Sequence, residues 1–425
     1  MQHEPLALIG VSDISGRVRG KAVPAGDLPM RIRQGIGWTP TNVMITAFGP
    51  IGDTPFRGLG DILMLPAPET EVKVDFGPDA LPEHFLLADI VNTDGTPWDC
   101  CLRAFAKRAA AALQDAAGLR VRCAFEQEFV YSGAMTTLHN GYSFDAFRRQ
   151  GAFGSVFVHA LKSAGVGPEC FLPEYAPGQF EVTCDPAIGV AAADRAVIIR
   201  ELARATATRL GQRAVFSPII DPNGVGSGVH IHISLLDKDG RPATYDAQRP
   251  FALSAVAARF VAGIMHHLPA LCAVTAPSVI SYIRLTPNRW APTRANLVQQ
   301  DREASIRICP IFTRPAVDAA TQFNFEYRVA DASASPYLAL GAIIWAGVDG
   351  IRRDLSLPAA DRAAEAPMLP RSLGEALDLL EATAEAKDWF GAVLLDAYLR
   401  HKRFEITQVR DLDPAEQCRR YAEVY

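Results

Sequence analysis

The chain has 425 residues, of which 49% are hydrophobic and 21% are charged, and its formal net charge is −5. This size and composition predict a soluble globular protein with a sizeable core, in two domains or in one large elaborated domain. The negative charge and the lack of a basic cluster exclude nucleic acid as an expected partner. The longest apolar run, residues 337–348, has 12 residues and is too short to cross a membrane.

The eight cysteines contain no C-x-x-C pair. In a chain of this size, that pattern favours reduced thiols over a disulfide or zinc framework. Residues 1–10 lack a basic segment followed by an apolar stretch, so nothing marks the chain for secretion. We therefore expect a cytoplasmic protein with no membrane partner.

Residues 1–95 are predicted to form a small β-rich domain. Strands are expected at residues 6–11, 17–23, 39–48 and 61–65, the first two joined by a turn. Only a short helix fits this region, near residues 29–34. A cluster of turn-forming residues at 92–97 marks the boundary, so a second domain is expected over residues 96–425.

From residue 96 onward, helices and strands alternate without the regular rhythm of a parallel α/β sheet. Asp99 is predicted to cap a helix that ends at Gly118. A strand follows at residues 121–131. Further helices are expected at residues 144–164, 191–210, 251–268 and 335–353, and further strands at 178–183, 214–219, 229–235 and 323–329. A capping box, SLGE at residues 372–375, opens a helical C-terminal region. The pattern predicts an α+β fold with an antiparallel sheet.

The strand at residues 121–131 carries two glutamates in the segment FEQEF. Because side chains alternate along a strand, Glu126 and Glu128 should share one face and Gln127 should point to the other. Two carboxylates about 7 Å apart on one face repel each other unless a cation lies between them. Alone, such a pair is more typical of a solvated strand face.

Later segments repeat this arrangement of polar groups on short strands and turns. The glutamates, histidines and serine concerned are Glu174, Glu181, His230, His232, Ser234 and Glu326, with Arg328 on the same face as Glu326. Five arginines also fall within 24 residues: Arg284, Arg289, Arg294, Arg302 and Arg307. Taken singly, these segments also fit a surface turn, a core histidine or a salt bridge on a strand.

Taken together, the segments indicate metal-assisted phosphoryl transfer. Carboxylate oxygens with one imidazole nitrogen suit Mg²⁺ or Mn²⁺, whereas zinc would favour cysteines at ligand spacing. Arginine forks bind carboxylates and phosphates. Divalent ions and arginines are the groups that neutralise charge in phosphoryl transfer. The G-x-x-x-x-G-K-[ST] motif is missing, so a P-loop enzyme is not expected.

In these segments, the chain resembles the glutamine synthetase superfamily over nearly its whole length, and in particular its γ-glutamyl-amine ligases. The matching motifs are residues 125–129, 174–181, 226–234, 281–292, 302–307 and 325–336, in the family's order and spacing. The resemblance implies an N-terminal β-grasp domain, residues 1–95, and a catalytic domain, residues 96–425, with a curved antiparallel sheet and surrounding helices. It also implies ATP as co-substrate and a dodecamer of two stacked hexamers, in which the small domain closes a neighbour's active site.

The resemblance further implies a role for each site residue. One metal would be held by Glu128, Glu174 and Glu181, and a second, bridging the nucleotide phosphates, by Glu126, His230 and Glu326. ATP would contact Glu169, His232, Ser234 and Arg307. The substrate would meet Gly226, Arg284, Trp290, Arg302 and Arg328, with Arg284 and Arg328 on its carboxylate and Arg302 on the transferring phosphoryl group. Arg302, Arg307 and Glu174 would be catalytic, Glu174 by orienting or deprotonating the amine.

The chain departs from the ammonia-using members at both acids that bind ammonium. Residues 287–292 read PNRWAP, so Trp290 stands where those members have a glutamate in P-G-Y-E-A-P. Residues 48–59 lack the F-D-G-S-S aspartate. An indole cannot accept a proton from ammonium, but it can pack against an alkyl or aryl group.

Other departures affect the acyl donor and the nucleotide. Val225 replaces an asparagine that helps to bind the α-amino group of glutamate, and Thr321 and Asn324 replace basic nucleotide contacts. We expect an ATP-dependent ligase that activates a carboxylate, the γ-carboxyl of glutamate, as an acyl phosphate and couples it to an organic amine larger than ammonia. The alternatives are a glutamine synthetase that uses ammonia and a catalytically silent ring protein with a structural or regulatory role.

Overall fold

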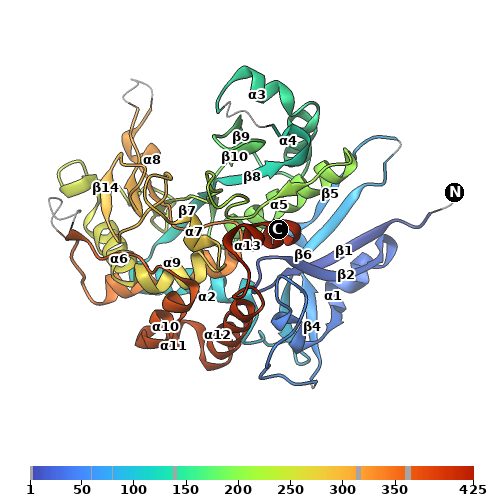
Figure 1. Ribbon diagram of the computed structural model, residues 1–425. Coiled ribbons are helices and arrows are strands. Elements are labelled where there is room, and N and C mark those ends of the chain that lie inside the picture. Colours follow the sequence, from blue (N-terminus) through green and yellow to red (C-terminus); the bar gives the residue numbers. More distant parts are fainter. Residues whose placement is uncertain (1–2, 59, 79, 137–140, 313–316, 359–364) are drawn as a thin grey trace.

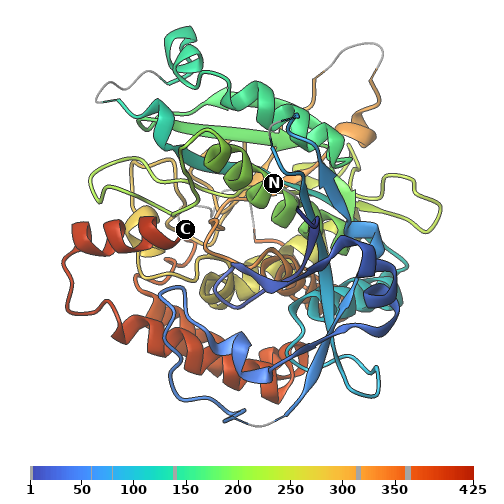
Figure 2. The same cartoon turned by 90° about the vertical axis from the view of Figure 1, so that its right-hand side faces the viewer.

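The computed structural model describes residues 3–58, 60–78, 80–136, 141–312, 317–358 and 365–425. The fold is α+β, as expected from the sequence. The N-terminal strands form one sheet at the side of the molecule, and the remainder of the chain builds a larger body of helices around two further sheets (Figure 1). In the view turned by 90°, the C-terminal helices lie below the two sheets of the larger body and beside the N-terminal sheet (Figure 2).

The N-terminal sheet has the strand order β2-β1-β6-β4-β3, with β5 paired to β6. Strands β1 and β6 are parallel and the other neighbours are antiparallel. Its elements are β1 (Leu6–Ser12), β2 (Val18–Pro24), α1 (Leu28–Gln34), β3 (Ile36–Trp38), β4 (Ile62–Pro66), β5 (Val72–Val74) and β6 (Glu83–Asn92). The central and mostly buried β6 was not expected from the sequence.

The strand predicted over residues 39–48 is wrong. Strand β3 ends before it, and Pro40–Met44 forms a short 3₁₀ helix instead. Pro40 explains the difference, because proline has no N–H for a strand ladder and its fixed φ suits the first position of a helical turn.

The larger body contains a six-stranded sheet, β11-β7-β13-β16-β15-β14, and a four-stranded sheet, β12-β8-β10-β9. The pairs are antiparallel except for β14 and β15. The strands are β7 (Arg120–Phe125), β8 (Gln127–Tyr131), β9 (Pro168–Pro173), β10 (Gln179–Cys184), β11 (Ala187–Ile188), β12 (Ala214–Val215), β13 (Ile231–Leu236), β14 (Leu297–Gln299), β15 (Ile306–Ile308) and β16 (Phe325–Tyr327).

The expected strand at residues 121–131 is divided between these two sheets at Glu126. Strand β7 belongs to the first sheet and β8 to the second, and the backbone N–H of Glu126 donates to the carbonyl of His230 at 2.9 Å. The predicted alternation holds across the division: Gln127 points away from the glutamates and accepts a hydrogen bond from Arg200 at 2.9 Å. Glu128 faces Glu181 of β10 in register.

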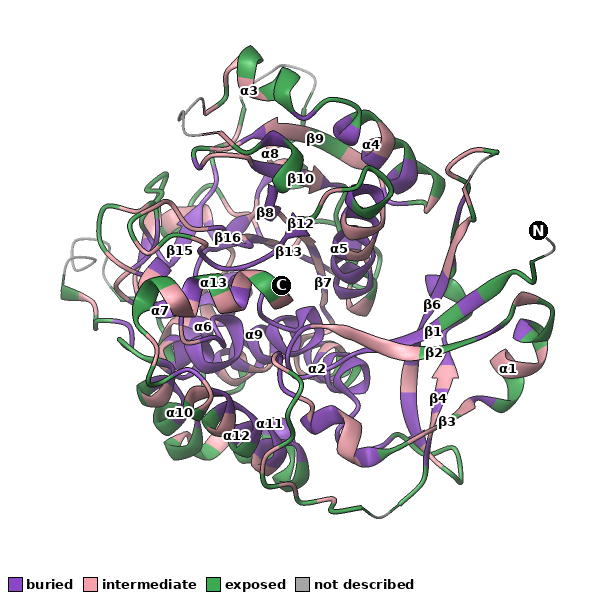
Figure 3. Cartoon of the chain, turned by 45° about the vertical axis from the view of Figure 1, so that its right-hand side comes forward, coloured by how far each residue is buried: buried purple, intermediate pink, exposed green. Residues whose placement is uncertain are grey.

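The helices pack around the sheets. They are α2 (Leu102–Ala117), α3 (Phe144–Arg149), α4 (Phe153–Ser163), α5 (Val190–Arg209), α6 (Ala255–Thr275), α7 (Ser281–Arg284), α8 (Ala319–Gln322), α9 (Pro336–Arg352), α10 (Leu373–Ala382), α11 (Ala384–Phe390), α12 (Ala392–Thr407) and α13 (Pro414–Val424). Helices α6 and α9 are largely buried, and α2 is buried along one face (Figure 3). Half of the expected capping box is present, because Ser372 Oγ accepts from the N–H of Glu375 at 3.1 Å, whereas the Glu375 carboxylate accepts from the N–H of Arg371 at 2.8 Å.

Three predicted helices have different bounds in the structure. Cys101, and not Asp99, caps α2. The helix predicted over residues 144–164 is two helices, separated where Gly151 adopts a φ of 61°. Helix α6 begins after its cap Ser254 and continues through Pro269. It is the one described helix long and apolar enough to cross a membrane, but most of it is buried against α9 and α10.

Helices α6 and α9 cross at two glycines. A Cβ atom on Gly263 would lie 2.7 Å from the Cα of Gly350 and would also strike the carbonyl of Ala346. Real Cβ atoms do not come so close to backbone, so these glycines set the distance between the two helices.

Gly263→Ala should therefore lower the thermal unfolding midpoint, because overpacking a tight core costs about 1–3 kcal/mol. Gly374→Ala is the matched control: it lies in a helix, and a Cβ there would have as its nearest neighbour Ser372 Oγ at 3.8 Å. Helix propensity should leave that variant as stable as the parent or slightly more stable. Equal midpoints for Gly263→Ala and the parent, by differential scanning fluorimetry, would contradict the packing described here.

Candidate active site

A cavity of about 580 Å³ opens where the two sheets of the larger body part. Eleven of the residues selected from the sequence line it: Glu126, Glu128, Glu174, Glu181, Gly226, His230, Arg284, Trp290, Arg302, Arg307 and Arg328. It is also lined by Tyr142, Tyr175, Gln179, Gly228 and Arg289. The fold thus gathers the eleven selected residues from six separate segments of the chain into one site.

A second cavity of about 250 Å³ lies on the other side of Glu126, which lines both. It brings together Glu169, His232 and Ser234, the three residues expected to contact ATP besides Arg307. Thr321 and Asn324 also line it, and Asn324 Oδ1 lies 2.8 Å from His232 Nδ1.

Three carboxylates crowd one side of the main cavity. Glu128 accepts from the N–H of Gly228 at 2.8 Å and from Gln179 at 3.1 Å, and Glu174 accepts from the hydroxyl of Tyr142 at 2.6 Å. Burial, with Glu174 nearby, raises the pKa of Glu128 to about 8. Burial and the charges of Glu126 and Glu128 raise the pKa of Glu181 to about 10. Among the described residues, Glu128 forms one ion pair, a 4.0 Å contact with His230, and no ion pair is found for Glu174 or Glu181.

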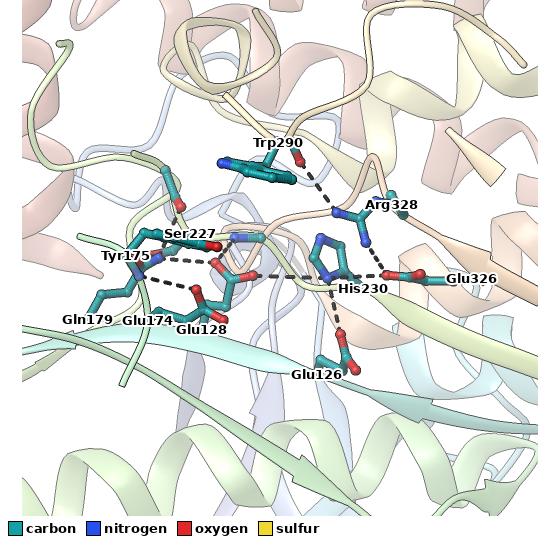
Figure 4. A network of polar contacts seen from close by, with 12 residues as sticks. Glu126, Glu128, Glu174, Tyr175, Gln179, Ser227, His230, Trp290, Glu326 and Arg328 are labelled. Carbon is teal, nitrogen blue, oxygen red and sulfur yellow. Dashed lines mark hydrogen bonds and ion pairs between the residues drawn. The ribbon is translucent and has the colours of Figure 1, made fainter. Parts of the chain in front are cut away.

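The carboxylates on the other side are surrounded by histidine and arginine side chains. His230 Nδ1 lies 3.1 Å from Glu126 and 3.4 Å from Glu326 (Figure 4). Arg307 and Arg328 each donate to Glu326 as well. Burial acts in the opposite sense, but His230 and Arg328 lower the pKa of Glu326. The carboxylate of Glu326 is therefore neutralised by neighbouring arginines, whereas Glu128, Glu174 and Glu181 have little positive charge near them.

These donors fit divalent metal ions. Oxygen-rich ligation with one imidazole suits Mg²⁺ and Mn²⁺. A cation would offset the burial and the mutual repulsion that together raise the pKa values of Glu128 and Glu181. Ligand atoms of Glu126, Glu181 and His230 lie within 4.8 Å of one another. Glu181 thus lies between the two groups: its carboxylate is close to Glu126 and His230, and it also interacts with Glu128 and Glu174, with which the family resemblance grouped it.

The glycine-rich turn before β13 allows a close approach to Arg284. A Cβ on Gly226 would lie 2.7 Å from Arg284 Cγ, and one on Gly228 would lie 2.8 Å from Arg284 Nη2. Arg284 itself is buried and donates to the carbonyls of Val329 and Arg328 at 3.0 and 3.1 Å. These contacts hold its guanidinium in the cavity wall.

Arg328 has a donor available for a ligand. Its Nη1 donates to Glu326 and its Nη2 to the carbonyl of Trp290 at 3.4 Å, but its buried Nε has no partner among the described residues. A buried unpaired donor is costly, and a ligand carboxylate would satisfy it. Arg302, by contrast, is exposed at the rim of the cavity.

The sequence did not single out Gln179 and Tyr142. Gln179 lies within a segment that was selected, and its amide donates to Glu128, to Ser227 at 3.0 Å and to the carbonyl of Gly226 at 3.0 Å. Its position at the start of a strand beside Glu181 was the available signal. Tyr142 belongs to no motif, and only the fold brings it to Glu174.

Comparison with known proteins gives a consistent assignment along the whole chain. Residues 99–421 match the family model "Glutamine synthetase, catalytic domain", and residues 1–98 match "Glutamine synthetase N-terminal domain". A gamma-glutamylpolyamine synthetase of Streptomyces coelicolor is 32% identical over 423 residues, 94% of this chain and 89% of that protein. A gamma-glutamylanilide synthase of an Acinetobacter species is 28% identical over 452 residues, 95% of this chain and 88% of that protein. A solved structure described as a novel glutamine synthase homolog has a TM-score of 0.95 and 40% identity, and covers 100% of this chain and 99% of its own.

Glu181→Gln should change the pH dependence of stability in a predictable direction. The folded pKa of Glu181, about 10, lies above its ordinary value of 4.5, so metal-free protein should lose unfolding free energy as the pH rises through this window. A neutral glutamine does not titrate. In EDTA, the variant should therefore gain in unfolding midpoint over the parent as the pH rises from about 6 to 9.

Adding Mg²⁺ or Mn²⁺ should raise the midpoint of the parent more than that of Glu181→Gln, because the variant loses a carboxylate ligand. Parallel pH profiles for the two proteins, with equal stabilisation by the ions, would show that Glu181 neither is strained by repulsion nor contacts a metal.

Proposed function

We propose that this chain joins the γ-carboxyl group of glutamate to an organic amine larger than ammonia. The premise is that the chain belongs to the glutamine synthetase family of ATP-dependent carbon–nitrogen ligases. One observation carries the amine assignment: Trp290, and not an acid, faces the cavity at the position where ammonia-using members carry a glutamate. The similarity to relatives named for γ-glutamyl transfer to polyamines and to aniline supports the same conclusion.

The acyl donor would be held by the arginines of the cavity wall. Arg284 and Arg328 lie together, and the unpaired Nε of Arg328 suits the α-carboxylate of glutamate. Gly226 gives the donor room beside Arg284. Val225 lines the same cavity without offering a hydrogen bond to an α-amino group, so the arginines would supply most of the recognition of the donor.

The glutamates would hold two divalent ions, Mg²⁺ or Mn²⁺, one at Glu128, Glu174 and Glu181 and one at Glu126, His230 and Glu326. When bound, these ions neutralise the negative charge of the phosphates of ATP. The second cavity would take the nucleoside end of ATP, with Glu169, His232 and Ser234 in its walls.

The reaction needs two transfers. The γ-carboxylate of glutamate attacks the γ-phosphate of ATP, which gives an acyl phosphate and ADP. The amine nitrogen then attacks the acyl carbon, phosphate leaves, and the nitrogen gives up a proton. Arg302 at the rim and Arg307 beside Glu326 are placed to neutralise charge on the transferring phosphoryl group.

Glu174 is the acid best placed to orient or deprotonate the amine. Burial raises its pKa, which makes its carboxylate a stronger base. The hydroxyl of Tyr142 donates to it, and because burial and that same carboxylate raise the pKa of Tyr142, the hydroxyl keeps its proton. Tyr142 would thus act as a positioning residue for Glu174.

The assembly and location follow from the family assignment as further proposals. We propose a cytoplasmic dodecamer of two stacked hexamers, built from an N-terminal domain over residues 1–95 and a catalytic domain over residues 96–425. Its substrates are small molecules, and the net charge of −5 does not favour nucleic acid as a partner.

The proposed activity predicts that ATP and glutamate will release phosphate with a panel of primary amines, but only weakly with ammonium. Trp290 replaces one of the two acids that bind ammonium in ammonia-using members, and residues 48–59 lack the other. Ammonium would therefore have neither of its anionic partners. Robust turnover with ammonium alone would instead identify a glutamine synthetase. Failure to bind Mg²⁺–ATP in calorimetry would identify a catalytically silent ring protein.

Glu128→Ala should abolish turnover with every amine while leaving the assembly unchanged in sedimentation. Glu128 lies on the floor of the cavity, where its loss removes a proposed metal ligand. Glu381→Ala is a suitable control, because Glu381 lies on the surface in an ion pair with Arg403, and such pairs contribute about 1 kcal/mol or less. Activity of Glu128→Ala equal to that of Glu381→Ala would refute the metal assignment.

A further inference from the structure

Three aromatic rings surround the acid that is proposed to meet the amine. Trp290 stacks on Tyr175 with ring centroids 5.8 Å apart and planes 9° from parallel, and Tyr142 meets Tyr175 edge-on at 5.4 Å (Figure 4 shows Trp290 and Tyr175). Tyr175 follows Glu174 directly, and Tyr142 donates to Glu174. Three segments distant in the sequence are thus joined at the cavity by their rings.

These rings are exposed to an unusual extent for large aromatic side chains. Tyr142 is 57% exposed, Tyr175 44% and Trp290 50%, and all three line the cavity. Trp290 and Tyr142 also have positive φ values, 55° and 58°. Non-glycine residues seldom adopt that conformation, and it tends to occur at ligand sites. Apolar surface held open at an active site is available to a ligand.

The charges around the cavity bear on which amine can enter. Besides its four glutamates, the cavity is lined by five arginines and by His230, whose pKa is lowered by burial. The other glutamates belong to the sheet floor, so Glu174 is the acid that lies among the rings. Near the rings, a second ammonium group on the amine would meet Arg289 and Arg302, since the other glutamates that line the cavity among the described residues lie on the sheet floor. Like charges would disfavour a diamine or polyamine there.

We propose that Tyr142, Tyr175 and Trp290 form an aromatic amine subsite, which selects primary monoamines that carry a flat apolar group, such as arylalkylamines, over polyamines. The nitrogen faces Glu174 and the flat group packs on the exposed rings. Offset or edge-to-face packing of aromatic rings favours an aryl group beyond its buried area alone. This inference rests on the proposed function, whose amine it narrows to one class.

The test uses three primary amines with the full-length enzyme, ATP and glutamate. Benzylamine carries a flat ring, n-butylamine has the chain without a ring, and putrescine is butylamine with a second ammonium group. We expect kcat/KM to fall in the order benzylamine, n-butylamine, putrescine, with about 10-fold or more between the first and the last. Putrescine as the best of the three would overturn the inference while leaving the proposed function intact.

Variants at Trp290 and Tyr175 test the role of the rings themselves. Trp290→Ala should lower the ratio of kcat/KM for benzylamine to that for n-butylamine by about 10-fold, whereas Trp290→Phe, which keeps a flat ring, should change it by less than about 3-fold. Tyr175→Ala and Tyr175→Phe should behave in the same way. Because the ratio is measured within one protein, it does not depend on the folded fraction.

Phe144→Ala provides the control, because it removes a ring that is 79% exposed and lies outside the cavity. Its ratio should equal that of the parent. An unchanged ratio in Trp290→Ala and Tyr175→Ala would overturn the subsite. Turnover with ammonium and with none of the amines would overturn the proposed function, and this inference with it.

Discussion

Repulsion among buried carboxylates is the constraint on which the site depends. Glu128, Glu174 and Glu181 are held together by the strands and turns that carry them, and burial raises the pKa of each. A fold would not retain such a group at no benefit, because it costs stability until a cation binds. The neighbouring pair, Glu126 and Glu326, instead lies beside His230, Arg307 and Arg328. Because of this asymmetry, Glu128, Glu174 and Glu181 need a metal ion to offset their charge, whereas Glu126 and Glu326 are already paired with histidine and arginine side chains.

The fold creates the asymmetry by dividing one strand between two sheets. At Glu126 the chain leaves the sheet of β7 and enters that of β8, so the two glutamates of a single short segment face different partners. The glycines before β13 then allow Arg284 to pack against the same junction. The rings of Tyr142, Tyr175 and Trp290 line the same cavity. Metal ligands, donor arginines and the proposed amine subsite are therefore placed by one break in the sheet.

Much of this was predictable, because side-chain alternation along a strand is a local property. The opposite orientations of Gln127 and Glu128, the shared face of Glu326 and Arg328, and the clustering of the motifs were expected and are observed. Residues 39–48 were misread because a proline outweighed their apolar pattern. The stacking of Tyr175 on Trp290 and the contact of Tyr142 with Glu174 join segments far apart in the chain. No local pattern encodes such contacts, so only the structure revealed them.

The central claim is that the carboxylates at the sheet junction hold divalent ions for an ATP-driven ligation. Anomalous diffraction from crystals grown with Mn²⁺ and ADP tests it most directly. We expect anomalous peaks among Glu128, Glu174 and Glu181 and among Glu126, His230 and Glu326. Well-ordered ADP with no manganese peak at this junction would contradict the account.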